Sequence, residues 1–376
     1  MNPDAIAPPL PALHALGRVL NAAGPYTPVG VSRSASAVAQ ATAWALQQHL
    51  PIAPLQTLVG RELAAFGATE AGTVVHCAAA GITLCVAAAL TGRDPDRMAR
   101  LPDTDGLARD VVVPAAHLID YGHPLATDIR LAGARVRACG EPDRCTLDAL
   151  REALAAPGVA ALLLVASRLV RGPALDLGAA CAAARAAGVP VFIDAAAQDL
   201  RVRELSALRP TALVLSAQKY LAAPTAGLVL GEADFIEAVD LQQRGIGRAM
   251  KPSKEALVGV LAALAERSRL DLGEWRAAQA QKTERALQAL HACPGLQAQV
   301  EPDPLGAPFA RVRVQVLAGP EAARRLAAAL KRHDPAVWVM EHGLPQGLLR
   351  LELVGLSGEE VDTACAALRA CAASLG

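Results

Sequence analysis

The chain has 376 residues, of which 53% are hydrophobic, so it is long enough to bury one large core or two linked ones. Its 36 basic and 36 acidic residues balance and form no long run of one sign, which excludes the basic footprint of a nucleic-acid or anionic-membrane binder. The longest apolar stretches, such as 84–90, are shorter than the roughly 20 residues that cross a bilayer.

The first ten residues carry no basic region followed by an apolar core, so we read no signal peptide and expect the protein in the cytoplasm. Eight cysteines are scattered without a Cys-x-x-Cys pair. Small buried hydrophobic side chains explain them better than disulfides or metal ligands, so no metal site is predicted.

Three regions follow one another along the chain. Residues 1–53 show little strand signal and are expected to pack on both domains that follow. Residues 54–250 alternate short aliphatic runs with alanine-rich stretches, which is typical of parallel strands joined by helices. The seven strand candidates are Gly72–His76, Asp110–Val113, Arg135–Ala138, Ala160–Val165, Val189–Ile193, Ala212–Leu215 and Gly227–Leu230. This pattern predicts an α/β domain built on one large, mostly parallel sheet.

Residues 251–376 show a different pattern of predicted helices and strands. A long amphipathic helix is predicted over Lys254–Arg285, and shorter strand and helix candidates alternate after it up to a last helix at Glu359–Leu375. This alternation predicts a smaller α+β domain.

Two polar side chains follow consecutive strands of the large domain. Asp194 ends the run Val191–Asp194, at the sheet edge where ligands bind in open α/β sheets, although an aspartate there can also cap the next helix. Lys219 lies in the turn after Ala212–Leu215, where a half-buried lysine must be neutral or paired unless the turn is simply solvated. Pyridoxal 5′-phosphate needs a neutral lysine and an acidic partner for its pyridine nitrogen, so this pair of residues favours that cofactor.

The stretch Gly72–Gly81 runs from a strand into a helix through small residues only. Small side chains let a phosphate approach the N–H groups at a helix N-terminus, where the helix dipole favours an anion. Ser216, three residues before Lys219, can add a hydroxyl to the same phosphate.

At these residues the chain resembles the fold-type I pyridoxal-phosphate enzymes. Within them it is most similar to the group that contains selenocysteine synthase (the seryl-tRNA selenium transferase) and D-glucosaminate-6-phosphate ammonia-lyase. The stretches that carry the resemblance are 20–27, 76–83, Val191–Gln198, Ser216–Lys219 and 247–255, in the order that the family shows. The resemblance implies the fold-type I transferase architecture, a large sheet domain with helices on both faces plus a small C-terminal domain.

The resemblance also implies roles for single residues. Lys219 is the Schiff-base lysine, Asp194 the partner of the pyridine nitrogen, and His117, or else His123, the ring over the cofactor. The implied cofactor-binding set is completed by Ala78, Ala79, Ala80, Gly81, Ser216 and Gln198. The implied substrate-binding set is Arg350, Arg248, Lys251, Thr27 and His123. Because the segment with Arg248 and Lys251 reaches a neighbouring subunit in such enzymes, a homodimer or larger homo-oligomer is expected.

The sequence predicts the cofactor more specifically than the reaction. Stabilising a carbanion at Cα can lead to elimination, racemisation, aldol cleavage or transamination. We expect a lyase that performs α,β-elimination on an amino acid or amino-sugar acid, with a racemase, epimerase or aldolase as the alternative. Because the chain has no net positive charge, a tRNA substrate is disfavoured. A nucleotide-binding oxidoreductase would need a Gly-x-Gly-x-x-Gly turn, which the sequence lacks, and intact Asp194 and Lys219 argue against a non-catalytic regulator.

Overall fold

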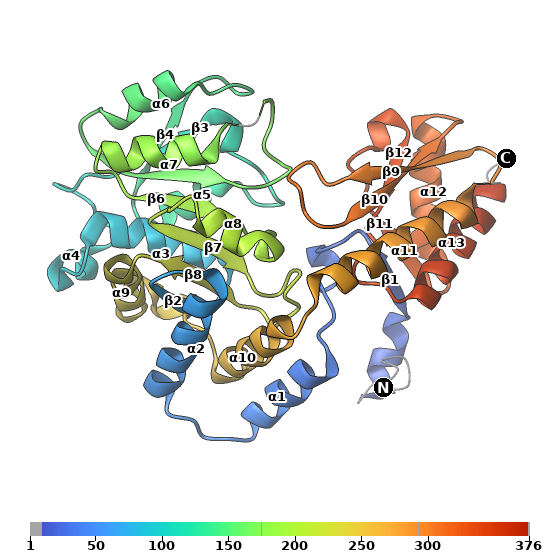
Figure 1. The fold of residues 1–376 in the computed structure, drawn as a ribbon, viewed down its shortest axis with the longest axis horizontal. Coiled ribbons are helices and arrows are strands. Elements are labelled where there is room, and N and C mark those ends of the chain that lie inside the picture. The colour runs from blue at the N-terminus through green and yellow to red at the C-terminus, as the bar shows by residue number, and fades with distance from the viewer. Residues whose placement is uncertain (1–9, 174, 292, 375–376) are drawn as a thin grey trace. The chain divides into compact units, whose positions relative to one another are not determined.

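A computed structural model describes residues 10–173, 175–291 and 293–374, which form two compact units (Figure 1). The larger unit runs from Ala37 to Arg269, and the smaller one joins the residues up to Ser36 to those from Leu270 onward. This division differs from the predicted boundaries at residues 53 and 250. The physical reason is that the helix Lys254–Ser268 (α10) packs against Ile52–Gly67 (α2), and both helices cover the large sheet.

The sheet of the larger unit contains seven strands, and it confirms the predicted mostly parallel α/β fold. The strands are β2 (Ala71–Val75), β3 (Asp110–Pro114), β4 (Arg135–Cys139), β5 (Val159–Val165), β6 (Val191–Asp194), β7 (Ala212–Ser216) and β8 (Gly227–Gly231). Their order in the sheet is β2-β8-β7-β6-β5-β3-β4, and β8 alone runs antiparallel to its neighbours.

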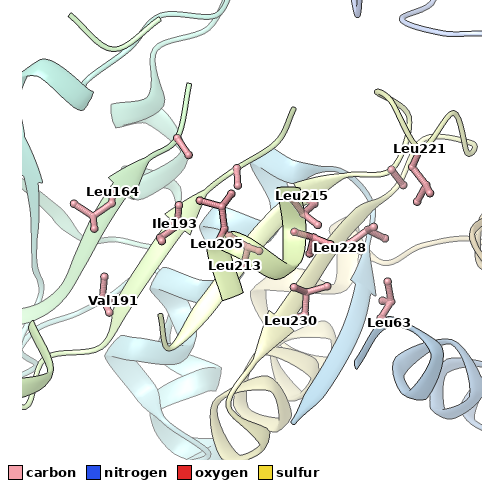
Figure 2. Close-up of a cluster of buried hydrophobic side chains, with 14 of the residues drawn as sticks. Leu63, Leu164, Val191, Ile193, Leu205, Leu213, Leu215, Leu221, Leu228 and Leu230 are labelled. Atoms are coloured by element: carbon pink, nitrogen blue, oxygen red, sulfur yellow. The ribbon is translucent and has the colours of Figure 1, made fainter. Parts of the chain in front are cut away.

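Both faces of this sheet are covered by helices, as expected for central strands that are mostly apolar. Alternate residues of β6 show how the core divides: Val191 and Ile193 pack on one face, and Phe192 on the other. Figure 2 shows the first face, where Leu63 of α2 and Leu205 approach the leucines of β7 and β8. Helices on this face are α1 (Ser36–Leu46), α2, α6 (Leu147–Leu154), α7 (Leu177–Ala186), α8 (Val202–Ser206) and α10. Helices on the other face are α3 (Ala78–Thr91), α5 (Leu125–Leu131) and α9 (Ala233–Leu241), while α4 (Pro95–Arg100) is a short helix after α3.

The smaller unit has its own apolar core. Its strands are β1 (Val19–Ala22), which pairs in parallel with β11 (Ala336–Val339), and the antiparallel set β9 (Leu296–Pro302), β10 (Ala310–Val316) and β12 (Leu348–Leu351). Its helices are α11 (Leu272–Leu290), α12 (Pro320–Arg332) and α13 (Gly358–Ala373). The single long helix predicted over Lys254–Arg285 is wrong, because Asp271 caps a new helix by accepting hydrogen bonds from Gly273 and Glu274 N–H.

The Asn21–Gly24 stretch has a visible structural role in this unit. The side chain of Asn21 donates to the carbonyl of Gly24 and accepts from the N–H of Ala23. Gly24 has a φ of 74°, and a Cβ there would lie 2.4 Å from the fully buried Glu352 carboxylate. Glu352 is in turn paired with Arg311, so glycine is required both by the backbone angle and by the neighbouring ion pair. None of the described helices is long and apolar enough to span a membrane.

Candidate active site

One edge of the large sheet collects the polar residues predicted from sequence. Strands β2, β3, β5, β6 and β7 all end at this edge, where Asp194 lies opposite Val165 of β5 and Val214 of β7. Two residues beyond Val214, Ser216 ends β7, and its carbonyl accepts a hydrogen bond from the Lys219 N–H at 3.2 Å. The pairing register therefore brings Asp194 and the Lys219 turn to adjacent strand ends.

Lys219 and Asp194 act on each other electrostatically. Asp194 is buried, and this burial raises the pKa of its carboxyl, while the charge of Lys219 and the N–H of Ala196 oppose the shift. Burial lowers the pKa of the half-buried Lys219 amine, and the charge of Asp194 opposes that shift. Burial thus favours the neutral amine of Lys219. The charge of each residue opposes the pKa shift that burial causes in the other.

Asp194 does not cap a helix. Its Oδ1 accepts a 3.0 Å hydrogen bond from Ala196 N–H, two residues on, and the next helical turn (η5) begins only at Asp199. The capping interpretation is therefore wrong. Among the described residues no other hydrogen bond reaches this carboxylate, which leaves an oxygen for a ligand.

The N-terminus of α3 lies against the start of β8 at the same edge. Gly227 makes this possible, since a Cβ there would lie 2.2 Å from the carbonyl oxygen of Cys77, the residue before the helix. Within the helix start, Cys77 Sγ accepts from Ala80 N–H and its carbonyl accepts from Gly81 N–H. Among the described residues, the N–H groups of Ala78 and Ala79 have no hydrogen-bond acceptor, as is usual for the first turn of a helix, and such N–H groups can bind an anion.

His117 follows β3 and is 2% exposed. Its Nδ1 accepts a 2.9 Å hydrogen bond from Val165 N–H, so Nδ1 carries no proton. Burial lowers the pKa of the imidazole to about 4. The ring is therefore a neutral group fixed to the end of β5.

Replacing His117 by glutamine is expected to make the free energy of unfolding less dependent on pH between pH 7 and pH 4. The folded protein keeps the pKa of His117 near 4, whereas an unfolded histidine titrates near 6.5, so lowering the pH between these values favours unfolding. Urea titrations from pH 7 down to pH 4 should show wild type losing about 3 kcal/mol more than His117→Gln. Parallel losses in the two proteins would contradict the buried neutral state.

Sequence reasoning missed a cluster around Asp128. This carboxylate is 2% exposed and accepts hydrogen bonds from Tyr121 Oη at 2.5 Å and His123 Nε2 at 2.7 Å. Burial raises the pKa of the Tyr121 hydroxyl, and so do its bond to Asp128 and the charges of Asp128 and Asp194. The signal in the sequence was the close spacing of a tyrosine, a histidine and an aspartate after β3.

Sequence reasoning also missed Asp199 and Arg267. The Asp199 carboxylate is fully buried, and Arg267 Nη2 of α10 lies 2.8 Å from its Oδ2. In the described part of the chain, neither oxygen of Asp199 accepts a hydrogen bond. The same Nη2 donates to the carbonyl of Tyr220, beside Lys219. Burial raises the pKa of Asp199, and the charges of Arg267 and Lys219 oppose this shift. Arg267 thus links α10 to the turn that contains Lys219 through a hydrogen bond.

The Arg267→Met protein is expected to be less stable than wild type by about 3–5 kcal/mol, because Asp199 would stay buried without a counter-charge. Adding Asp199→Asn removes that charge, so the double variant should recover part of the loss. Urea unfolding of the three proteins measures both effects. A double variant that is no more stable than Arg267→Met would contradict this explanation.

The remaining predicted residues lie in different surroundings. Gln198 is buried directly before η5, and its Oε1 accepts a hydrogen bond from Arg201. Arg248 and Lys251 are exposed and line a cavity of about 1030 Å³ beside α2, whose walls include neither Lys219 nor Asp194. Thr27 and Arg350 belong to the smaller unit, where Arg350 is paired with Glu301 at 2.5 Å. Their participation in the site stays a prediction.

Comparisons with known proteins extend this picture. The chain is 33% identical over 356 residues to D-glucosaminate-6-phosphate ammonia lyase of Salmonella typhimurium (strain 14028s / SGSC 2262), covering 94% of this chain and 95% of the relative. It is 32% identical over 351 residues to a 5′-C-glycyluridine monooxygenase-decarboxylase of a Streptomyces species, covering 91% and 87%. A solved structure of D-glucosaminate-6-phosphate ammonia-lyase aligns over 98% of this chain and 99% of its own, with a TM-score of 0.86 and 33% identity. No family model matches the chain.

The residues of this edge fit pyridoxal phosphate. A buried carboxylate with an oxygen left for a protonated ring nitrogen, a lysine biased toward its neutral form and a helix N-terminus with open N–H groups match the three parts of that cofactor. Solved structures of other fold-type I enzymes share the fold at 16–18% identity. The chain therefore belongs to the D-glucosaminate-6-phosphate ammonia lyase family of fold-type I enzymes, the pyridoxal-phosphate-dependent lyases that the sequence resemblance indicated.

Proposed function

We propose that this enzyme removes ammonia from a phosphorylated 2-amino-2-deoxy sugar acid, with D-glucosaminate 6-phosphate as the first candidate, by α,β-elimination. The observation that supports this most is the similarity to the ammonia lyase, which extends along nearly the whole of both chains in sequence and in structure. Loss of the C2 proton and the C3 hydroxyl gives an enamine, which hydrolyses to a 2-keto acid and ammonia.

Lys219 and Asp194 would divide the chemistry at the sheet edge. Bound pyridoxal phosphate supplies the electron sink that makes the Cα proton acidic. Asp194 would hold the proton on the pyridine nitrogen through the oxygen that Ala196 leaves open. The Lys219 amine, whose pKa burial lowers, would take the Cα proton as a general base.

The phosphate of the cofactor would lie at the start of α3. The N–H groups of Ala78 and Ala79 and the hydroxyl of Ser216 are the donors that we assign to it, with Gln198 as a further polar neighbour of the cofactor. His117 is fixed as a neutral ring by Val165 N–H, which suits a residue that packs over the cofactor without adding charge.

A homodimer is part of the proposal. Arg248 and Lys251 are two exposed cations that line a cavity without Lys219, and we assign them to the phosphate group of a substrate bound in a second copy of the chain. Thr27 and Arg350 are assigned to the substrate, and Arg350 would exchange its contact with Glu301 for a carboxylate of the substrate. Location in the cytoplasm stays a prediction.

The experiment is a substrate comparison with the purified, cofactor-loaded protein. D-glucosaminate 6-phosphate, D-glucosaminate and D- and L-serine are incubated separately, and ammonia, 2-keto acid and optical rotation are followed. We expect equal amounts of ammonia and keto acid, released fastest from the phosphorylated sugar acid. Inversion of a substrate without keto acid would instead support a racemase.

The second candidate is an oxygen-dependent decarboxylation, because the Streptomyces relative is almost equally similar. It predicts oxygen consumption and carbon dioxide release from a glycine-like group attached to a nucleoside. An oxygen electrode reading in the same incubations separates the two reactions: consumption that matches product formation would replace the lyase assignment.

A further inference from the structure

A tight loop between β3 and α5 directs two side chains at one buried carboxylate. Gly122, with a φ of 92°, allows the chain to turn so that Asp120 and Pro124 form an antiparallel bridge. Tyr121 and His123, on either side of this glycine, both contact Asp128 in the first turn of α5. The backbone of Asp128 is itself fixed, since its carbonyl accepts a hydrogen bond from Thr83 of α3.

The two rings of this loop differ in what they can do. Tyr121 donates its one proton to Asp128 Oδ2, and burial together with the Asp128 bond raises the pKa of its hydroxyl, so it is a poor proton source. His123 also donates to Asp128, through Nε2, and its ring has a second nitrogen. The His123 side chain keeps 39% of its surface exposed, so the ring is accessible to a small molecule.

The loop lies near the residues already assigned to the reaction. The charge of Asp128 raises the pKa of the Asp194 carboxyl. The charges of Asp194 and of Cys77, at the start of α3, raise the pKa of the Tyr121 hydroxyl. A histidine held by a buried carboxylate in such a place has the arrangement of an acid–base dyad, in which the carboxylate orients the ring.

We propose that His123 is the catalytic acid that protonates the leaving C3 hydroxyl, and that Asp128 is its positioning residue. The inference rests on the proposed elimination. When Lys219 removes the Cα proton, the C3–O bond breaks, its electron pair stays with oxygen, and the proton on His123 Nδ1 moves to that oxygen to give water. The neutral imidazole then regains a proton from solvent, while its Nε2–H stays bonded to Asp128.

The test separates the first proton transfer from the loss of the hydroxyl. In deuterium oxide, exchange of the C2 hydrogen of D-glucosaminate 6-phosphate reports on Lys219, and ammonia release reports on the complete elimination. His123→Gln should keep C2 exchange within about threefold of wild type and lower ammonia release by about 10²–10⁴-fold. Asp128→Asn should show the same pattern, with C2 exchange kept and ammonia release lowered, and His291→Gln, at an exposed histidine after α11, should change neither rate.

A measurement without cofactor tests the dyad itself. Nitrogen NMR of the cofactor-free protein should show a hydrogen-bonded Nε2–H of His123 that disappears in Asp128→Ala, which removes the acceptor oxygen. If His123→Gln slows exchange and ammonia release equally, or slows neither, His123 is not the acid. If wild type exchanges C2 hydrogen but releases no ammonia, the proposed elimination fails independently of the His123 assignment.

Discussion

The Lys219→Ala protein is expected to form no covalent bond with pyridoxal phosphate and to release ammonia at least about 10⁴-fold more slowly than wild type. Two functions are lost together, because the same amine attaches the cofactor and then acts as the base at Cα. The amine suits both, since burial in the turn after β7 lowers its pKa and favours the neutral, nucleophilic form.

Borohydride reduction followed by mass spectrometry of peptides measures the attachment. Wild type should carry the reduced adduct on the peptide that contains Lys219, and Lys219→Ala should carry none. Lys331→Ala is the matched control, because this lysine lies on α12 of the smaller unit and pairs with Glu341. A reduced adduct that persists in Lys219→Ala would place the cofactor on another lysine.

The fold was largely predictable from sequence for a simple physical reason. Strands buried on both faces are mostly apolar, so most of the seven appear in the sequence as short aliphatic runs, whereas the edge strand β4 carries Arg135 and Arg137. The structure has all seven strands within a few residues of the predicted ranges. The break between α10 and α11 was not predictable from periodicity, since both helices are amphipathic and only the capping by Asp271 separates them.

The site was predictable where a residue ends a strand, and not where it depends on packing. Asp194 and Lys219 follow consecutive apolar runs, so the parallel arrangement alone brings them to one edge. Asp128 and Asp199 lie in or beside short helical turns, where an aspartate usually faces solvent, and only the structure shows that both are buried. Arg267 is 68 residues from Asp199, and no local pattern relates the two.

The boundary between the two units was also not predictable from sequence, because it too depends on packing. The sequence pattern changes after Gly247, and helix α10 begins at Lys254, so the sequence placed α10 with the smaller domain predicted from residue 251. Its apolar face, with Leu257 and Val260, instead completes the core on one side of the large sheet. This placement matters for the site, because it is α10 that brings Arg267 to the carbonyl of Tyr220.

Asp194→Asn is expected to retain the cofactor yet release ammonia about 10²–10³-fold more slowly. Lys219 stays able to attach the cofactor, but an amide cannot hold a proton on the pyridine nitrogen as a carboxylate does, so the electron sink weakens. The variant should also change the pH at which cofactor is captured. The charge of Asp194 opposes the lowering of the Lys219 pKa, so its removal lowers that pKa further, and capture should reach half its maximal rate at a lower pH.

Visible absorbance after mixing with pyridoxal phosphate, recorded from pH 6 to pH 10, measures capture, and ammonia release at saturating cofactor measures the reaction. Asp148→Asn, at an exposed position of α6 beside Arg151, serves as the control and should match wild type in both. The two readouts distinguish the causes, because a general loss of folding would reduce capture at every pH without moving its midpoint. An Asp194→Asn protein with the wild-type rate and an unshifted midpoint would mean that this carboxylate acts on neither the ring nitrogen nor Lys219.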